Sequence, residues 1–423
     1  MKNILFITPY FPPNEAVGSK RSLNLARHLG KSGWQPVILT NPDNSRKNDD
    51  FYNQILPENR IIVEKYSPGV RNAVTTGKQN GNFFTRIPLL KTIHDRGHYF
   101  TPFDQYMWHI PYAIRSAKKL VEKYRPVLIL VNADPWSTFM VAHRVSRWAN
   151  IPWIADMRDP WSLHEYKMNQ RPSVIQSIIR YYEGLFFRSA AKIILNTENC
   201  CHAYQARYST AIDVDRFTWI RNAFDREIYK TPRPGNPGNR FSLHYFGSFR
   251  DYVRPDRLFD TVSDFIRKNN ISNAEFELVL YGNPDESNLN LARHLDLLSY
   301  ITIHPYIKSR DTLQYLQDAS LLVLIEGPER NLQLPAKLYD YLASGRPIWA
   351  ISDNEELNRI IRETCSGVVS DYHDSADCLT ALEQLYASRN SKRDFNEPAL
   401  YEYSVQRQIT KFCDVFSEVC SSC

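Results

Sequence analysis

Two carboxylates follow a short apolar segment in the first half of the chain, where polar side chains can do chemistry. Asp156 and Asp159 come after the apolar run 153–155 and flank Arg158. Such a run predicts a buried strand, and carboxylates at its carboxyl end can orient substrate hydroxyl groups or accept a proton. An Asp–Arg pair that only fixes a loop is the alternative, but the position at a strand end favours the chemical role.

Asp134 occupies the equivalent place after the preceding apolar run, 126–131. Its carboxylate is therefore a second candidate for binding hydroxyl groups. The alternative is that Asp134 or Ser137 is the N-cap of the next helix, and the adjacent Pro135 favours this alternative.

A turn with one glycine follows the first predicted strand. Gly18 lets a ligand approach the backbone closely, and Ser19 is a suitable N-cap for a helix whose free amides attract an anion. The turn lacks the three glycines of the dinucleotide-binding fingerprint. On this feature alone, an ordinary strand-to-helix loop is the favoured interpretation.

A glycine and two arginines follow the first apolar run of the second half. Gly247 ends the run 241–246, and Arg250 and Arg254 come next. Arginine suits a diphosphate because its planar fork donates paired hydrogen bonds. Two solvated loop arginines are the alternative.

The most informative segment is a polar loop, 326–334, that leads into a predicted helix with Pro335 at its first position. The N-terminal end of a helix carries partial positive charge and attracts phosphate. Lys337 adds a full charge in the first turn. Asp340, nearly one turn further on, can reach the hydroxyl groups of a ribose.

Strands and helices alternate through both halves of the chain and must position these residues. The first half has predicted strands at 2–8, 36–40, 61–64, 126–131, 153–155 and 192–195, with helices at 19–29, 112–123, 137–148 and 172–191. The segment 231–239 is rich in Pro, Gly and Asn and predicts a linker. Predicted strands then follow at 241–246, 276–281, 301–303, 321–325, 347–350 and 367–369, with helices between them and a last helix at 402–419.

This alternation predicts an α/β protein with two doubly wound parallel-sheet domains of the Rossmann type. The predicted domains are 1–225 and 240–395, and we expect the C-terminal helix within 400–423 to pack back on the first domain. Ligands of such sheets bind outside the carboxyl ends of the strands. We therefore expect the site in a cleft between the two domains.

Composition narrows the class of protein. The chain has 423 residues, of which 43% are hydrophobic and 23% charged, as in globular proteins. No apolar run approaches the ~20 residues that span a bilayer, and the N-terminal apolar stretch is too short for a signal peptide. The seven cysteines form no pair of CxxC motifs, so no zinc site is expected. The prediction is a cytoplasmic protein.

Positive charge is concentrated in one segment. Residues 60–125 contain 12 basic and 4 acidic side chains, whereas the whole chain has a net charge of +6. Aromatic residues cluster in the same segment, within 83–112. This combination suggests an anionic membrane surface or an anionic substrate, with nucleic acid as a third option. A solvated helical face over an aromatic core is an equally good interpretation.

Taken together, these stretches resemble the GT-B glycosyltransferases of family 4, the large retaining group. The resemblance covers nearly the whole chain and rests on the opening residues 4–13 with Gly18, on 156–161, on 222–225 and on 335–347. The last stretch, Pro-Ala-Lys-Leu-Tyr-Asp-Tyr-Leu-Ala-Ser-Gly-Arg-Pro, is the most specific.

The resemblance implies a nucleotide-sugar donor bound mainly by the C-terminal domain, an acceptor bound mainly by the N-terminal domain, and no metal or cofactor. The implied catalytic group is Asp134, Asp156, Asp159 and Arg254. The implied donor-binding group is Gly18, Ser19, Gly247, Arg250, Arg254, Glu329, Leu334, Pro335, Lys337 and Asp340.

The sequence departs from the family pattern at the donor loop. Many members carry two glutamates eight positions apart, but here the second is Asp340 and the first falls on Leu332. Leu332 cannot bond a donor sugar through its side chain, so Glu329 or the backbone amides of 331–334 would take its place. A second lysine expected after the first strand of the C-terminal domain is also missing, and Lys337 can compensate.

The expected function is transfer of a sugar to a glycan or lipid-linked acceptor in the synthesis of cell-surface polysaccharide, lipopolysaccharide or glycolipid. Segment 83–112 lies where this family often docks on membranes, so we expect the inner face of the plasma membrane as a docking surface and no nucleic-acid partner. A sugar-nucleotide epimerase of GT-B form and a non-catalytic GT-B scaffold are the alternatives.

Overall fold

The computed structural model describes residues 1–12, 18–40, 62–65, 97–225, 240–249, 253–307, 312–327, 330–391 and 393–421. Contacts divide the chain into two compact units. Unit 1 comprises Met1–Arg221 and Ile409–Cys423, and unit 2 comprises Asn222–Gln408. The linker predicted at 231–239 lies outside the described residues.

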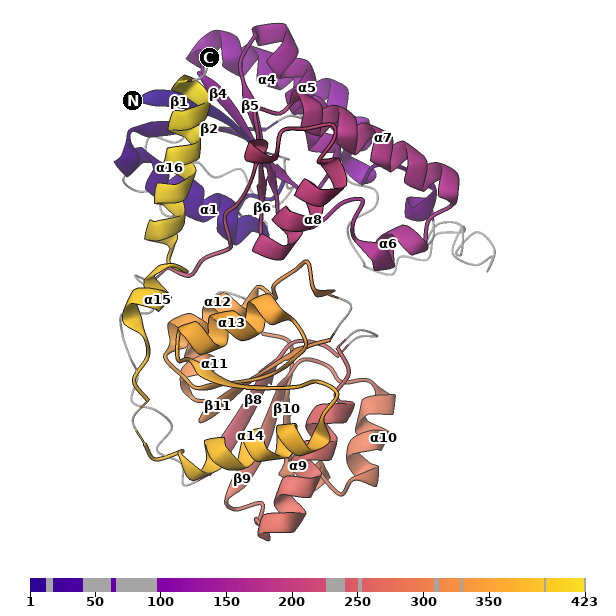
Figure 1. Ribbon diagram of the computed structural model, residues 1–423, viewed down its shortest axis with the longest axis vertical. Helices are drawn as coiled ribbons and strands as arrows, with labels where there is room; N and C mark the ends of the chain where they lie inside the picture. The colour runs from indigo at the N-terminus through magenta and orange to yellow at the C-terminus, as the bar shows by residue number, and fades with distance from the viewer. Residues whose placement is uncertain are drawn as a thin grey trace. The chain divides into compact units, whose positions relative to one another are not determined.

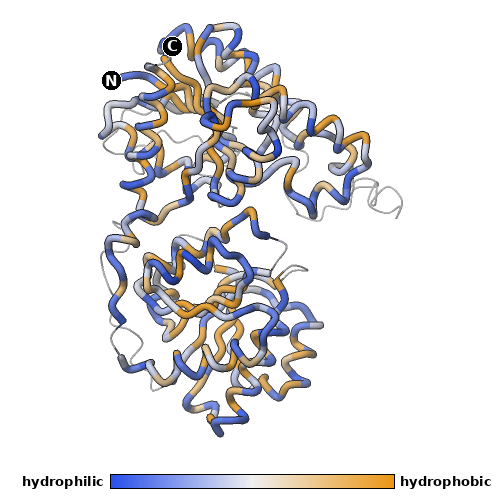
Figure 2. The backbone as a smooth tube through the Cα atoms, viewed as in Figure 1, coloured by the Kyte–Doolittle hydropathy of each residue, from blue (hydrophilic) through white to orange (hydrophobic). Residues whose placement is uncertain are grey.

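Unit 1 is built on a seven-stranded sheet with the order β3-β2-β1-β4-β5-β6-β7, and every neighbouring pair is parallel (Figure 1). Its strands are β1 Lys2–Ile7, β2 Trp34–Thr40, β3 Ile62–Lys65, β4 Leu128–Ala133, β5 Trp153–Met157, β6 Lys192–Leu195 and β7 Phe217–Trp219. The central strands β4 and β5 are buried on both faces, which explains the apolar runs 128–131 and 153–155 in the sequence. Figure 2 shows these apolar strands inside the unit.

The helices of unit 1 are α1 Gly18–Leu29, α4 Ile110–Tyr124, α5 Ser137–Ala149, α6 Glu165–Asn169, α7 Ser173–Ser189, α8 Glu198–Tyr208 and α16 Val405–Ser421. Short 3-10 turns are η1 Gly30–Ser32, η3 Gly97–Phe100, η4 Gln105–His109 and η5 Val214–Arg216. Helix α4 packs on α5, and α5 packs on α7. The last helix lies against this unit, where the Phe416 ring is 5.5 Å from the Trp34 ring.

The C-terminal helical segment differs from the sequence prediction. The last helix, predicted over 402–419, begins later, at Val405, and a short helix that the sequence did not predict, α15 Glu397–Tyr401, precedes it. The later start has a local cause, because the Ser404 hydroxyl accepts a hydrogen bond from the Arg407 backbone amide at 3.3 Å and so caps α16.

Unit 2 has a six-stranded parallel sheet with the order β10-β9-β8-β11-β12-β13. Its strands are β8 Phe241–Phe246, β9 Phe276–Tyr281, β10 Ile301–His304, β11 Leu321–Glu326, β12 Ile348–Ser352 and β13 Gly367–Ser370. Its helices are α9 Asp256–Asn269, α10 Glu286–His294, α11 Thr312–Gln317, α12 Lys337–Ser344, α13 Glu355–Glu363 and α14 Ser375–Ala387, with a 3-10 turn η6 at Leu298–Tyr300.

Helices cover both faces of the unit 2 sheet. Alternate residues of β11 pack into two separate apolar clusters, Val323 into one and Leu324 into the other. The first cluster holds side chains of α9, α10 and α14, and the second holds side chains of α11, α12 and α13 (Figure 1). Both units are therefore doubly wound α/β sheets, and the predicted fold class is confirmed.

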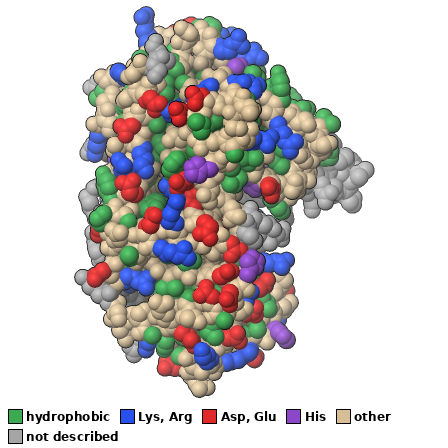
Figure 3. Space-filling model, viewed as in Figure 1, with side chains coloured by type: hydrophobic (Ala, Val, Ile, Leu, Met, Phe, Trp, Pro, Cys, Tyr) green, Lys and Arg blue, Asp and Glu red, His purple; other side chains and the backbone are tan. Residues whose placement is uncertain are grey.

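The surface is polar and mixed in charge. On the face drawn in Figure 3, acidic and basic side chains are interspersed over both units. In the part of the chain that the structure describes, no helix combines the length and apolarity needed to cross a membrane.

Candidate functional site

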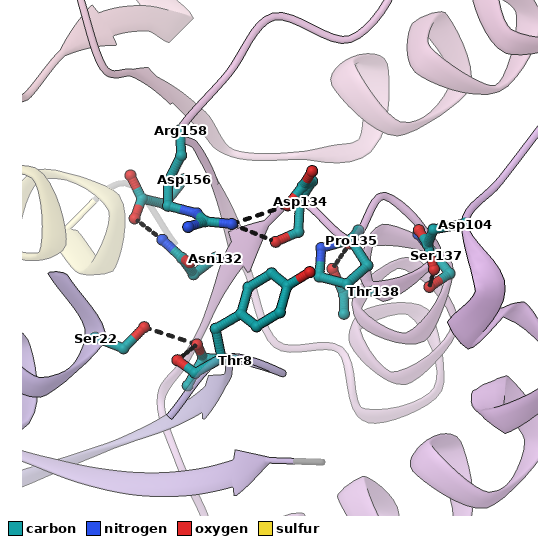
Figure 4. A network of polar contacts seen from close by, with 11 residues as sticks. Thr8, Ser22, Asp104, Asn132, Asp134, Pro135, Ser137, Thr138, Asp156 and Arg158 are labelled. Atoms are coloured by element: carbon teal, nitrogen blue, oxygen red, sulfur yellow. Dashed lines mark hydrogen bonds and ion pairs between the residues drawn. The ribbon is translucent and has the colours of Figure 1, made fainter. Parts of the chain in front are cut away.

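The carboxyl ends of β1, β4 and β5 bring polar residues to one edge of the unit 1 sheet (Figure 4). Thr8 follows β1, Asp134 follows β4 and Arg158 follows β5. The chain turns after β4 through two cis peptide bonds, Ala133–Asp134 and Asp134–Pro135. The predicted grouping of Asp134 with the segment after β5 is therefore present in the fold.

Asp134 and Arg158 form an ion pair at this edge. The Arg158 Nη2 atom lies 2.9 Å from Asp134 Oδ1 and also donates to the Asp134 backbone carbonyl at 2.8 Å. The guanidinium lies over the Tyr10 ring, 5.1 Å from its centre. The Asp134 side chain keeps 30% exposure, so a ligand can reach it. Burial raises the pKa of Asp134, and the Arg158 charge opposes this rise.

Gly18 is required by this arrangement. A Cβ atom on Gly18 would lie 1.5 Å from Arg158 Nη1, so the guanidinium fills the space beside its backbone. The sequence predicts that this space serves a ligand, and the structure places Arg158 there. Ser19 lies inside the first turn of α1, not at its N-cap, and its buried hydroxyl has no hydrogen-bond partner among the described residues.

Asp156 is an internal anchor. It is fully buried, and its carboxylate accepts bonds from Arg21 Nε at 2.9 Å, from Arg21 Nη2 at 2.6 Å and from Asn132 at 2.7 Å. Arg21 also donates to the carbonyls of Ile220 and Arg221, where the chain leaves unit 1. This geometry gives no support to the predicted contact of Asp156 with a substrate, because no solvent reaches its oxygens.

Asp159 is partly exposed, and its charge contributes to the raised pKa of Asp134. These two carboxylates are therefore neighbours that a ligand at this edge can meet together. The sequence predicts both of them as groups that handle hydroxyls, and their placement is compatible with that role.

The cap of α5 comes from Asp104, which sequence reasoning missed. Its carboxylate accepts bonds from the Ser137 amide at 2.8 Å, from the Ser137 hydroxyl at 2.7 Å and from the Tyr106 amide at 3.0 Å. Asp134 is therefore not the N-cap of α5. The pattern Asp104-Gln-Tyr106 signals only the local turn, because the contact with α5 spans 33 residues of sequence.

A second polar cluster lies at the carboxyl-end edge of the unit 2 sheet, where β8 and β11 end. Lys337 donates from Nζ to the Phe246 backbone carbonyl at 3.3 Å, and its ammonium lies 4.3 Å from the centre of the Tyr245 ring. Burial lowers the pKa of Lys337 to about 8, and the charge of Glu326 partly counteracts this shift.

Glu326 is the buried counter-ion of this cluster. It is 1% exposed, and its Oε1 atom lies 3.1 Å from Arg330 Nη1. Burial raises the pKa of Glu326, whereas the charges of Arg330 and Lys337 lower it. Sequence reasoning missed this residue, although a charged residue directly after the apolar run 321–325 was a usable signal.

The other predicted residues of unit 2 are spread over the same edge and beyond it. Gly247 has φ +134° and lies against Gly282, whose Cβ, if present, would be 2.6 Å from the Gly247 carbonyl oxygen. Leu334 is buried, and Asp340 lies in the first turn of α12. Arg254 is solvated, with 67% of its side chain exposed and 4.0 Å between its Nη1 and the Asp256 carboxylate.

Three predictions in unit 2 need correction or lie beyond the structure. Helix α12 begins at Lys337, so Pro335 precedes the helix and is not its first residue. Arg250 and Glu329 lie outside the described residues. Among the residues that the structure describes, no three His, Cys, Asp or Glu side chains are grouped to hold a metal ion.

Comparison with known families decides the class of this fold. Residues 19–228 match the family described as Glycosyltransferase Family 4, and residues 240–388 match Glycosyl transferases group 1. The chain belongs to the GT-B glycosyltransferases of family 4. The resemblance of the sequence to this family is confirmed, and so is the enzyme class, glycosyltransferase. No curated protein sequence matches this family 4 glycosyltransferase.

Solved structures share the fold of this family 4 glycosyltransferase at low sequence identity. Sucrose-phosphate synthase from Thermosynechococcus elongatus is 14% identical with a TM-score of 0.67, and the match covers 100% of both chains. Alr3699/HepE from Anabaena, in complex with UDP and glucose, is 13% identical with a TM-score of 0.62 over 99% of this chain and 100% of that one. The lipopolysaccharide outer core galactosyltransferase WaaB is 11% identical with a TM-score of 0.59 over 98% and 99%.

Proposed function

We propose that this family 4 glycosyltransferase transfers a sugar from a nucleotide-sugar donor to a glycan or lipid-linked acceptor, with retention of the anomeric configuration. The observation that carries the proposal is the Lys337 cluster of unit 2. A partly buried ammonium at the carboxyl end of a parallel sheet, next to a helix start, is suited to a diphosphate. The HepE structure, which holds UDP and glucose in the same fold, supports a nucleotide-sugar donor.

The leaving diphosphate gains negative charge as the glycosidic bond breaks. Lys337 is already held in place by the Phe246 carbonyl, so it can stabilise this charge without reorganising. Arg254 is solvated and not anchored in this way, and it would contribute by moving toward the phosphates. Asp340, in the same helix, would bond the ribose hydroxyls.

Asp134 is the side chain that we assign to the acceptor. It is exposed enough to meet a hydroxyl group, and its ion pair with Arg158 fixes its orientation. In the retaining reaction that we propose, the leaving phosphate helps to deprotonate the acceptor hydroxyl on the same face of the sugar. Asp134 and Asp159 then orient that hydroxyl, and no covalent nucleophile is assigned.

An exposed aromatic surface supports a lipid-linked acceptor at the cytoplasmic face of a membrane. Phe100, Trp108 and Tyr112 are 64%, 76% and 51% exposed. On α4, exposed Arg115 and Lys119 lie three and seven residues after Tyr112, and so on the same helical face. Aromatic rings beside cations favour an anionic lipid surface. The part of this segment at 83–96 lies outside the described residues.

Vesicle flotation tests the docking surface. The full-length protein should float with vesicles of phosphatidylcholine and phosphatidylglycerol at low salt, and the W108S/Y112S variant should not. Tyr401→Ser is the matched control, because Tyr401 is a 45% exposed aromatic residue of unit 2. Flotation that W108S/Y112S leaves unchanged would remove this surface from the proposal.

Product analysis tests the transferase itself. The protein is incubated with UDP-, GDP-, ADP- and CMP-sugars and with cell-envelope glycolipids as acceptors, and the products are followed by NMR. A transferase releases the nucleotide and leaves the transferred sugar with its original anomeric configuration. An epimerase yields a new nucleotide-sugar with its phosphates attached, and a scaffold yields no product at all.

A further inference from the structure

Three aromatic rings stack in parallel at the carboxyl-end edge of unit 1. The Phe186 and Trp161 rings are 6.3 Å apart with 9° between their planes, and the Trp161 and Trp136 rings are 5.2 Å apart with 8°. Phe186 is fully buried and Trp161 is 5% exposed, whereas Trp136, at the outer end of the stack, is partly exposed. The stack therefore fixes the plane of one partly exposed indole ring, that of Trp136.

A buried carboxylate fixes the middle of this stack. Glu183 accepts bonds from the Ser162 amide at 2.9 Å, the Ser162 hydroxyl at 2.5 Å, the Tyr204 hydroxyl at 3.0 Å and the Tyr208 hydroxyl at 2.8 Å. The Tyr204 hydroxyl in turn accepts the Trp161 amide at 2.8 Å. These hydrogen bonds fix the loop that carries Trp161. The three stacked rings, which we call the platform, are therefore rigid in the absence of ligand.

Two aspartates lie two residues before the tryptophans of the stack. Asp134 precedes Trp136 by two residues and keeps 30% exposure, and Asp159 precedes Trp161 by two residues. The charges of Asp159 and Asp104 act on Asp134, and those of Arg158 and Lys167 oppose them. A ligand that lies on the Trp136 ring therefore meets an apolar plane beneath it and acceptor oxygens at its rim.

A pyranose ring has the matching chemistry, since one of its faces is lined by C–H groups and its rim carries hydroxyl donors. A nucleotide would also stack on an indole, but Arg158 already pairs with Asp134, and Asp159 adds negative charge at this edge. A bare polyprenyl chain offers no hydrogen-bond donor to Asp134 and would cost the desolvation of the exposed part of this carboxylate.

We infer that Trp136 is the floor of a saccharide subsite in unit 1, so the acceptor presents an uncharged pyranose ring to this edge. The inference rests on the proposed function, because it names the chemical class of the acceptor. It adds a specificity-determining residue, Trp136, that sequence reasoning did not single out.

Saturation-transfer NMR on the full-length protein tests the subsite. The probes are the methyl pyranosides of glucose, galactose, mannose and N-acetylglucosamine, with methyl glucuronide as the anionic comparison. At least one neutral glycoside should receive saturation on its ring C–H protons, and methyl glucuronide should receive less. Trp136→Leu should abolish the signal. Trp148→Leu should keep it, because Trp148 is a 46% exposed indole near the C-terminal end of α5, the helix that follows Trp136.

The outcomes are distinct. If no neutral glycoside receives saturation from the wild-type protein, or if W136L gives the wild-type signal, the subsite is wrong. Asp134→Asn, which leaves the aromatic stack in place, provides a second test that does not depend on the folding of W136L. Its signal should fall several-fold, and an unchanged signal would contradict the inference. Nucleoside diphosphate binding is assigned to unit 2 and is measured on the same samples. Its absence in the wild-type protein would count against the proposed function and not against the subsite.

Discussion

The Lys337 ammonium donates a hydrogen bond to the Phe246 backbone carbonyl at 3.3 Å. This contact joins the start of α12 to the end of β8, two segments 91 residues apart. It places a cation beside Gly247, where the chain turns with a positive φ and presents backbone instead of side chain. The fold therefore holds the Lys337 ammonium, which we expect to bind the donor phosphates, in place before the donor binds.

Donor binding should depend on pH. Burial lowers the pKa of Lys337 to about 8, so in the free protein its ammonium loses its proton as the pH rises through that value. A bound diphosphate favours the charged form and raises the pKa again. Binding above pH 7 should therefore take up a proton, and affinity should fall as the pH rises from about 7 to 9. Calorimetric titration with the nucleoside diphosphate at pH 8 in HEPES and in Tris measures this uptake, and equal heats in both buffers would exclude it.

The two aspartates at the edge of the unit 1 sheet should respond differently to amidation. Asp134→Asn should leave the fold stable, because its pair is partly exposed, and should lower the transfer rate by about 10²-fold or more. Asp156→Asn breaks a buried ion pair with Arg21 and should cost about 3–5 kcal/mol of the free energy of unfolding. Urea denaturation and product assays of both variants measure the contrast. A stable D156N protein with no activity would reverse these assignments.

Gly18→Ala should act through Arg158. The new Cβ would lie 1.5 Å from the guanidinium, which must then leave its place beside Asp134. This displacement should lower the free energy of unfolding by about 1–3 kcal/mol. A double-mutant cycle checks the route, since G18A should cost almost nothing in a protein that already carries Arg158→Ala. Equal losses in both backgrounds would show that Gly18 matters for another reason.

Glu183 should be a strong determinant of stability. Glu183→Ala leaves the buried donors of Ser162, Tyr204 and Tyr208 without an acceptor, and should cost about 3 kcal/mol or more of the free energy of unfolding. Glu275→Ala is the control, because Glu275 is an exposed glutamate whose side chain bonds Ser272, three residues away. Chemical denaturation measures both. A cost for E183A no larger than that for E275A would show that the carboxylate does not hold the loop.

Much of the fold could be predicted from sequence because parallel strands covered on both faces are continuous apolar runs. The apolar runs 128–131 and 321–325 are examples, and both are fully buried. Helix ends were harder to predict, since the Ser404 cap that sets the start of α16 is a single hydrogen bond within a helical pattern.

The site could be predicted only in part, because its supporting contacts join distant residues. Asp134 and Lys337 follow recognisable local patterns. Arg21 meets Asp156 across 135 positions, and Asp104 caps α5 across 33. Glu183 occurs within a helix, where an acidic residue ordinarily indicates a solvated face. No local spacing marks such partners.

The most direct measurement of the central claim is calorimetric titration of the full-length protein with UDP, GDP, ADP and CMP at pH 7, repeated on Lys337→Met. The account predicts that at least one nucleotide binds and that K337M weakens it about 10–100-fold. Lys268→Met should bind as wild type, because Lys268 is an exposed lysine of the same unit, paired with Glu383. Binding of no nucleotide, or equally tight binding by K337M, would contradict the donor site proposed here.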